Sequence, residues 1–181
     1  MRIYAETNRI LLREIVLEDA AAMFEMDSDP EVHQYLGKSP VDTIEESIDQ
    51  IKFIRKQYED LGIGRWAIIE KSTNQFVGWG GLKYRTDVIN KTSNFYDVGY
   101  RLLQRHWGKG YATESAKASV KYAFEVLDVP AVYAMANVEN IGSRNALLKT
   151  GLHIVTQLNH EGIACDWFEI TKEQWISSQH P

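Results

Sequence analysis

The chain has 181 residues and a net charge of −5, with 20 Lys and Arg residues against 25 Asp and Glu residues. This length is that of one ordinary domain, and we expect a single domain over residues 1–181. The basic residues are scattered and form no stripe, which argues against a nucleic-acid partner because such binding depends on neutralising phosphates.

Cysteine and histidine give no sign of a metal centre. Cys165 is the single cysteine of the chain, so neither an internal disulfide nor a thiolate cluster is available. No two histidines lie at ligand spacing in the set His33, His106, His153, His160 and His180. We therefore predict no metal. Because we find no apolar leader and no apolar run of about 20 residues, we expect a cytoplasmic protein without a membrane partner.

The first third of the chain predicts one strand and three helices. An Asp before Pro30 favours a short helix beginning there, since proline suits the first helical position. Thr43 and Glu46 form a capping-box pattern at the start of a long amphipathic helix. In order, the expected elements are a strand over 9–13, a helix over 17–24, the short helix from Pro30, and the helix over 43–61.

Two strands, 65–70 and 75–84, follow as a hairpin joined by a short polar turn. The second strand contains Gly78, Gly80 and Gly81, which weaken a strand unless it bulges or another group approaches closely. The hairpin's aromatic side chains could line a pocket, but we expect core packing for Trp66, Trp79 and Tyr84.

The centre of the sequence predicts a strand, a glycine turn and a helix. The strand covers 95–102, and apolar residues then recur at helical spacing from Ala112 to Leu127. Gly108 and Gly110 lie at the mouth of this helix, where free backbone N–H groups and the helix dipole favour an anion. Arg105 and Lys109 add positive charge. We expect a phosphate site here, with a purely structural turn as the alternative.

The last third predicts a strand over 131–136, a polar loop, a helix over 143–150, and two closing strands over 152–158 and 163–170. Gly151 follows the helix and is a stop signal of the left-handed type. The turn between the closing strands covers 159–162.

Three phosphate-binding motifs can be compared with the glycine turn. The Walker A pattern is absent because no Gly-Lys-Ser/Thr follows a spaced glycine. The dinucleotide pattern has Thr113 in place of its third glycine, and Asp128 precedes the next strand instead of ending it, which argues against a nicotinamide-dependent enzyme. The pattern Arg/Gln-x-x-Gly-x-Gly/Ala fits residues 105–110. This resembles the pyrophosphate loop of the GNAT acetyltransferase superfamily.

Further landmarks resemble the RimJ/RimL-like branch of that superfamily. They are Asp29-Pro30-Glu31-Val32, Tyr35-Leu36, Asp97-Val98-Gly99-Tyr100, the block from Trp107 to Glu114, Asn140 with Ser143, and Lys149-Thr150-Gly151-Leu152. The resemblance implies an α+β fold of three layers. It implies a mixed, mostly antiparallel, curved sheet of six or seven strands with helices on both faces. It also implies a V-shaped splay between the strand ending at Leu102 and the strand beginning near Ala131.

The resemblance further implies an acetyl-coenzyme-A site in that splay. The pantetheine arm should pair with strand backbone as an added strand would. The cofactor-binding residues implied are Leu102, Leu103, Arg105, Gly108, Lys109, Gly110, Tyr111, Ala112, Thr113 and Asn140.

Two residues are candidates for the chemistry. Ser143 matches the position where RimL-like enzymes place a hydroxyl near the thioester sulfur, and its alternative role is to cap the following helix. Leu147 stands where many other family members have a tyrosine, which excludes a tyrosine acid there. Asp97, acting through water, is the candidate base, with Glu114 behind it; the alternative for Glu114 is a solvated carboxylate on the helix surface.

The resemblance implies transfer of an acetyl group from acetyl-coenzyme A to a primary amine, by direct attack in a ternary complex. Negative charge on Glu25, Asp27, Asp29 and Glu31 favours a cationic acceptor. A protein N-terminal amine is the first expectation. The alternatives are a small-molecule amine such as a polyamine or an antibiotic, and a coenzyme-A-binding sensor without catalysis. We expect a monomer or a homodimer.

Overall fold

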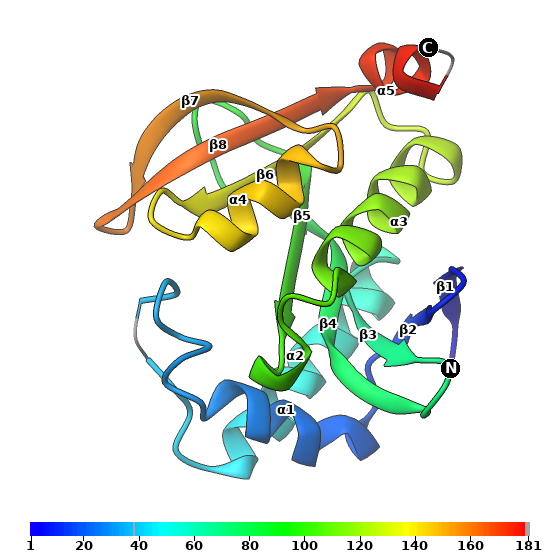
Figure 1. Cartoon of the computed structure of the whole chain (residues 1–181), viewed down its shortest axis with the longest axis vertical. Helices are drawn as coiled ribbons and strands as arrows, with labels where there is room; N and C mark the ends of the chain where they lie inside the picture. The colour runs from blue at the N-terminus through cyan, green and yellow to red at the C-terminus, as the bar shows by residue number, and fades with distance from the viewer. Residues whose placement is uncertain (38, 180–181) are drawn as a thin grey trace.

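The computed structural model describes residues 1–37 and 39–179, and one mixed sheet lies at its centre (Figure 1). The strand order is β1-β2-β3-β4-β5-β6-β8-β7. The strands are β1 (Ile3–Glu6), β2 (Ile10–Glu14), β3 (Arg65–Glu70), β4 (Gln75–Arg85), β5 (Phe95–Leu102), β6 (Ala131–Asn137), β7 (His153–His160) and β8 (Ile163–Thr171). The predicted fold class is confirmed.

The sheet has eight strands, one more than the upper prediction of seven. The additional strand is β1, which pairs antiparallel with β2 at the sheet edge. β1 has only four residues, too few for an alternating pattern to be recognised in the sequence.

Helices cover both faces of the sheet. The helices are α1 (Ala20–Asp27), α2 (Ile44–Leu61), α3 (Tyr111–Glu125), α4 (Ile141–Leu148) and α5 (Lys172–Gln179). Residues of α1 and α2 share one buried cluster with β3, and residues of α3 share another with β5 and β6. In the part of the chain that the structure describes, no helix is long and apolar enough to cross a membrane.

The long helix α2 forms for the local reasons that its sequence indicates. The carboxylate of Glu46 accepts a hydrogen bond of 3.1 Å from the backbone N–H of Thr43, so the capping box is present. Gly62 ends the helix in the left-handed conformation, with a φ of 69°. The expected start and stop of this helix are both confirmed.

The short helix expected from Pro30 is wrong, because residues 30–37 form successive turns. Most of their backbone hydrogen bonds join residues three apart, as from Gln34 N–H to the carbonyl of Glu31 at 3.3 Å and from Leu36 N–H to that of His33 at 3.0 Å. The carboxylate of Asp29 binds the N–H of Glu31 at 2.9 Å, which favours a turn over a continued helix.

The sequence did not predict α5, which follows β8 directly. None of its residues is buried, so it lacks the apolar stripe by which helices are recognised in sequence. Trp175 nevertheless anchors it to α3, with its ring 5.3 Å from that of Phe124.

The sheet divides where β5 and β6 part. These two strands are parallel and pair only at Asp97 and Tyr133. Beyond that pair, β5 stays with β4 as far as Leu102, while β6 stays with β8 as far as Asn137. Figure 1 shows β6 running away from β5. The predicted splay is therefore present, and the ends of β5 and β6 carry backbone groups with no strand partner between them.

Candidate active site

The glycine turn ends with an uncapped helix N-terminus. Gly108 and Gly110 have φ angles of 71° and 83°, in the left-handed region that favours glycine. Gly110 is the N-cap of α3, and no side chain caps this end. The helical hydrogen bonds begin with Glu114 N–H to the carbonyl of Gly110 at 3.0 Å. The N–H groups of residues 111–113 are thus available to an anion.

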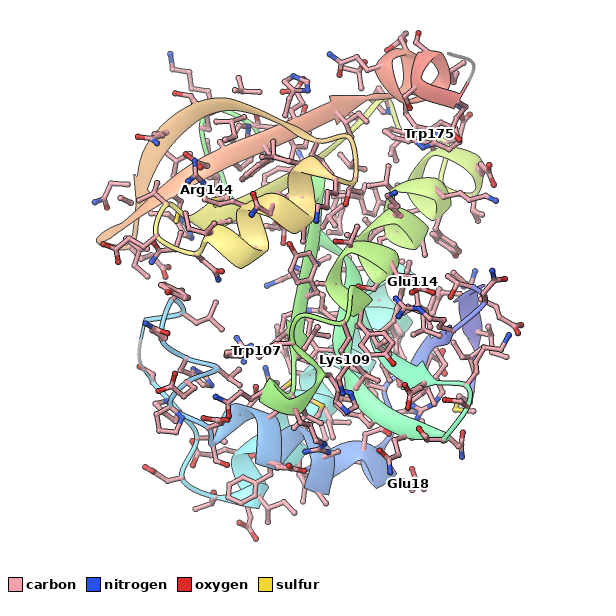
Figure 2. All side chains as sticks on the ribbon, in the orientation of Figure 1. Glu18, Trp107, Lys109, Glu114, Arg144 and Trp175 are labelled. Carbon is pink, nitrogen blue, oxygen red and sulfur yellow. The ribbon has the colours of Figure 1, made fainter. Side chains whose placement is uncertain are left out.

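Open space lies over this turn. A Cβ atom built on Gly108 would meet no atom within 4 Å, so only its φ angle requires glycine. Figure 2 shows Lys109 at the turn, just below α3. An uncapped helix start, an open surface and a cation together fit a pyrophosphate group.

The cations around the turn differ from the predicted pair. Arg105 forms an ion pair with Glu25 of α1. Arg9, immediately before β2, was missed by the sequence analysis. Its Nη1 donates a 3.0 Å hydrogen bond to the carbonyl of Lys109, and its guanidinium lies 4.8 Å from the centre of the Tyr111 ring. Arg9 therefore brings a guanidinium to the glycine turn from near the start of the chain, and this guanidinium is itself paired with Glu114.

Glu114 is held by the segment that carries Arg9. Its Oε1 accepts a 2.5 Å hydrogen bond from the Thr7 hydroxyl, and its Oε2 accepts one of 2.7 Å from Arg9 Nε. Figure 2 shows Glu114 at the start of α3. Both carboxylate oxygens are engaged in joining the turn between β1 and β2 to α3, so Glu114 forms a structural ion pair instead of a solvated carboxylate.

Two backbone groups at the end of β5 are already hydrogen-bonded within the chain. The N–H of Leu103 donates to the carbonyl of Val77 at 3.0 Å, and Trp107 Nε1 donates to the carbonyl of Leu102 at 2.9 Å. These contacts fix the direction in which the chain leaves β5 for the glycine turn.

Ser143 lies against β5 across the splay. Its Oγ is 3.2 Å from the hydroxyl oxygen of Tyr100, and that hydroxyl also donates to the Ser143 carbonyl at 2.8 Å. Burial raises the pKa of Tyr100 to about 12, so this phenol keeps its proton at neutral pH. The sequence analysis missed Tyr100 because a tyrosine in a strand is usually explained by packing.

The capping role considered for Ser143 is wrong. The helix begins at Ile141, two residues earlier than predicted, and Asn140 is its N-cap. Asn140 Oδ1 accepts a 3.0 Å hydrogen bond from the N–H of Ser143. An asparagine three residues ahead satisfies that N–H, which leaves the serine hydroxyl free to face Tyr100.

Asp97 is buried and paired. Its carboxylate forms an ion pair with Arg65, whose Nη1 donates at 2.7 Å to the carbonyls of both Asp97 and Gly81. Burial lowers the pKa of Arg65, and Asp97 opposes that shift. Gly99 leaves space for the Arg65 guanidinium, because a Cβ atom at residue 99 would lie 2.6 Å from Arg65 Nη2. Asp97 therefore has a structural role at the point where β5 and β6 are still joined.

The acidic residues near the proposed entrance do not form one negative surface. Glu25 pairs with Arg105, while Asp27 is fully buried and accepts a 2.7 Å hydrogen bond from Arg101 Nη1. Across the described residues, no group of three His, Cys, Asp or Glu side chains is arranged to hold a metal ion.

The comparisons identify the family. Residues 9–153 match the family model of the acetyltransferase (GNAT) domain. The chain belongs to the GNAT acetyltransferase family. The N-acetyltransferase YoaA of Bacillus subtilis, described as uncharacterized, is 30% identical over 146 residues, which cover 81% of this chain and 80% of YoaA.

Solved GNAT structures share the fold. RimL, a ribosomal L7/L12 α-N-protein acetyltransferase in complex with coenzyme A, has a TM-score of 0.78 at 16% identity over 94% of this chain and 98% of its own. The aminoglycoside acetyltransferase AAC(6')-Ib in complex with coenzyme A has a TM-score of 0.78 at 12% identity over 94% of this chain and 99% of its own. The prediction of an acetyl-coenzyme-A-dependent N-acetyltransferase is confirmed.

Proposed function

We propose that this GNAT enzyme transfers the acetyl group of acetyl-coenzyme A to a primary amine, by direct attack in a ternary complex. The observation that carries the proposal is the meeting of two features at the end of β5. One is the splay between β5 and β6, and the other is the uncapped N-terminus of α3. A long ligand with a pyrophosphate at one place and an extended arm beyond it fits both features together.

The coenzyme would be held mainly by backbone groups. Supporting observations are the free N–H groups of Tyr111, Ala112 and Thr113 and the left-handed Gly108 and Gly110. Arg9, Arg105 and Lys109 would add charge, while Leu102, Leu103 and Asn140 would contact the arm. When bound, acetyl-coenzyme A supplies the thioester carbonyl carbon and a thiolate leaving group.

Ser143 and Tyr100 would act together in protonating the leaving thiolate. The Ser143 hydroxyl lies at the splay and is 3.2 Å from the Tyr100 hydroxyl oxygen, which stays protonated because its pKa is raised. Ser143 would donate its proton to sulfur and take up the proton that the attacking nitrogen releases, while the Tyr100 hydroxyl would hold the serine hydroxyl in position. Asp97 stays a predicted base through water, although Arg65 already holds its carboxylate.

The acceptor we propose is a protein N-terminal amine, and its support is the fold shared with RimL. A small-molecule amine is the second candidate, because the fold is equally shared with an aminoglycoside acetyltransferase. Both classes present a primary amine to the same splay, and fold alone does not choose between them.

The coenzyme site can be tested by calorimetric titration of acetyl-coenzyme A into wild type and Gly108→Glu. The matched control is Gly162→Glu, because both glycines have positive φ and open space at the Cβ position. We expect binding by wild type and control and loss in Gly108→Glu. Equal binding by all three would contradict the pyrophosphate assignment.

The acceptor can be tested by following thiol release from acetyl-coenzyme A with three amines. The probes are a peptide with a free N-terminal serine and its lysines blocked, spermidine, and kanamycin. We expect the highest kcat/KM for the peptide. A higher value for spermidine or kanamycin would favour the small-molecule class, and no release with any amine would contradict the proposed transfer.

A further inference from the structure

Helix α4 is attached to strands on both sides of the splay. From the β5 side, the hydroxyl of Tyr100 donates a 2.8 Å hydrogen bond to the carbonyl of Ser143 and lies 3.2 Å from its Oγ. From the other side, Nε of Arg144 donates a 2.6 Å hydrogen bond to the carboxylate of Asp166 on β8. Figure 2 shows Arg144 on the side of α4 that faces β8. Two consecutive residues of one helix are therefore attached to opposite halves of the sheet.

The carboxylate of Asp166 is a fixed acceptor for Arg144. It is fully buried, and its second oxygen, Oδ1, accepts a 2.9 Å hydrogen bond from Nε2 of Gln157 on the neighbouring strand β7. A buried carboxylate needs such partners, because a charge that is removed from water without them is strongly destabilising. Asp166 is thus held by groups from two elements, and its position gives Arg144 a well-defined partner.

Arg144 has a second contact that orients the helix. Its Nη1 donates a 3.3 Å hydrogen bond to the carbonyl of Val138, in the loop between β6 and α4. A guanidinium is a rigid plane with donors in fixed directions, so bonds from two of its nitrogens fix both its place and its orientation. The start of α4 is therefore tied to β8 and to the loop from which the helix begins.

The two attachments lie opposite each other across the splay. The parallel strands β5 and β6 pair at Asp97 and Tyr133. Tyr100 is the third residue after Asp97 on β5. Ala136, which pairs with Asp166 of β8, is the third residue after Tyr133 on β6. Because a strand advances about 3.3 Å per residue, both attachments lie about 10 Å beyond the last pair between the two strands.

The position of the Ser143 hydroxyl in the splay depends on both attachments. Beyond the pair of Asp97 and Tyr133, no backbone hydrogen bond between β5 and β6 fixes the distance between the two strands in the described part of the chain. Without the attachment to Asp166, the start of α4 would keep its contacts with Tyr100 and could move with β5. A misplacement of about 1 Å can cost about 100-fold in rate, so the second attachment matters for the chemistry.

We propose that Arg144 and Asp166 are positioning residues for acetyl transfer. They hold the Ser143 hydroxyl from the β8 side of the splay, at the place that the thioester sulfur would occupy, while Tyr100 holds it from β5. The inference rests on the proposed function, in which Ser143 protonates the leaving thiolate. Arg144 and Asp166 act only through Ser143, and no proton is transferred to or from their ion pair.

The test is a double-mutant cycle on kcat, which detects residues that act through one another. Arg144→Gln is made in wild type and in Ser143→Ala, and thiol release is followed with the fastest of the N-terminal serine peptide, spermidine and kanamycin. Arg144→Gln leaves the Asp166 carboxylate buried without its cation, which favours unfolding. The neutral variant Arg144→Gln/Asp166→Asn avoids this charge and is therefore made in both backgrounds as well.

The matched control is Arg13→Gln/Asp19→Asn. Arg13 of β2 and Asp19, immediately before α1, form a second buried ion pair between a strand and the start of a helix. The side chains are 13% and 7% exposed, and two hydrogen bonds of 2.8 Å join them. The control therefore measures how the loss of such a pair affects turnover when α4 is left as it is. We expect it to keep the kcat of wild type.

We expect Arg144→Gln and the neutral variant to lower kcat about 10-fold when Ser143 is present, because a small displacement of the hydroxyl slows the chemical step. The Kd of acetyl-coenzyme A, measured by calorimetric titration into each variant, should be unchanged, since the glycine turn and α3 are untouched. In the Ser143→Ala background the same changes should cause no further loss, because no hydroxyl remains to be positioned.

Other outcomes would overturn the assignment in distinguishable ways. An equal loss in both backgrounds would make the ion pair purely structural, and an unchanged kcat in the wild-type background would show that Ser143 needs no second attachment. A weaker Kd for acetyl-coenzyme A would place Arg144 in the coenzyme site instead. If wild type released no thiol with any amine, the proposed function itself would be wrong, and this inference with it.

Discussion

The indole N–H of Trp107 donates a 2.9 Å hydrogen bond to the carbonyl oxygen of Leu102, the last residue of β5. Figure 2 shows Trp107 on the turn between β5 and α3, and its side chain is partly exposed. In the proposed complex, the same carbonyl faces the pantetheine arm. The indole and the coenzyme would therefore compete for the Leu102 carbonyl oxygen.

Trp107→Phe keeps an aromatic ring but removes the donor. We expect acetyl-coenzyme A to bind about 2–10-fold more tightly, which corresponds to one neutral hydrogen bond of about 0.5–1.5 kcal/mol. The measurement is calorimetric titration, with Trp175→Phe on α5 as the control. Weaker binding would show that the indole positions the turn instead of competing with the ligand.

Ser143→Ala removes the proposed proton donor to sulfur. We expect kcat to fall about 100-fold or more, with no change in the Kd of acetyl-coenzyme A and little change in stability. The reason is that Ser143 does not cap α4. Unchanged turnover in an active protein would remove Ser143 from the chemistry.

Asn140→Ala should destabilise the fold, unlike Ser143→Ala. It removes the Oδ1 atom that caps α4 through Ser143 N–H, so the free energy of unfolding should fall by about 1 kcal/mol. Chemical denaturation of both variants measures the difference. If Ser143→Ala were the more destabilising of the two, the cap assignment would be wrong.

Arg9→Gln removes a cation that the structure brings to the glycine turn. We expect acetyl-coenzyme A to bind about 5-fold more weakly, because the guanidinium is half exposed and solvent screens its charge. Arg2→Gln is a suitable control, since Arg2 contacts Tyr122 instead of the turn. Binding should also become less dependent on salt; an unchanged Kd would restrict Arg9 to structure.

Stability should depend on pH through His33 and His106. Burial and neighbouring cations lower the pKa of both, so the unfolded chain binds more protons below the ordinary value of 6.5. The free energy of unfolding should then fall as pH drops below about 6.5, by at most about 1.4 kcal/mol per pH unit for each group. Above that pH neither group contributes.

Denaturation between pH 7 and pH 5 measures this slope. His33→Gln and His106→Gln should each flatten it, whereas His153→Gln, at an exposed position, should leave it as in wild type. A slope that neither variant changes would assign the acid sensitivity to carboxylates alone.

Local sequence was sufficient wherever the physical cause is local. The capping box at Thr43, the stop at Gly62 and the strand, glycine turn and helix around Gly108 depend on neighbours within a few residues, and all are present. The short helix expected at Pro30 failed because Asp29 can bind the N–H of Glu31 and stabilise a turn. Pattern alone does not separate these two uses of an aspartate before proline.

What the sequence by itself determined is the family, the order of the elements from β2 to β8 apart from the helix expected at Pro30, and the glycine turn at the start of α3. The tertiary structure decided which side chains surround the chemistry. Arg9 lies 100 residues from Lys109, Tyr100 lies 43 from Ser143, and Arg101 lies 74 from Asp27. Such partners meet only when the sheet forms, because no periodicity or spacing in the chain encodes a contact between distant strands and helices.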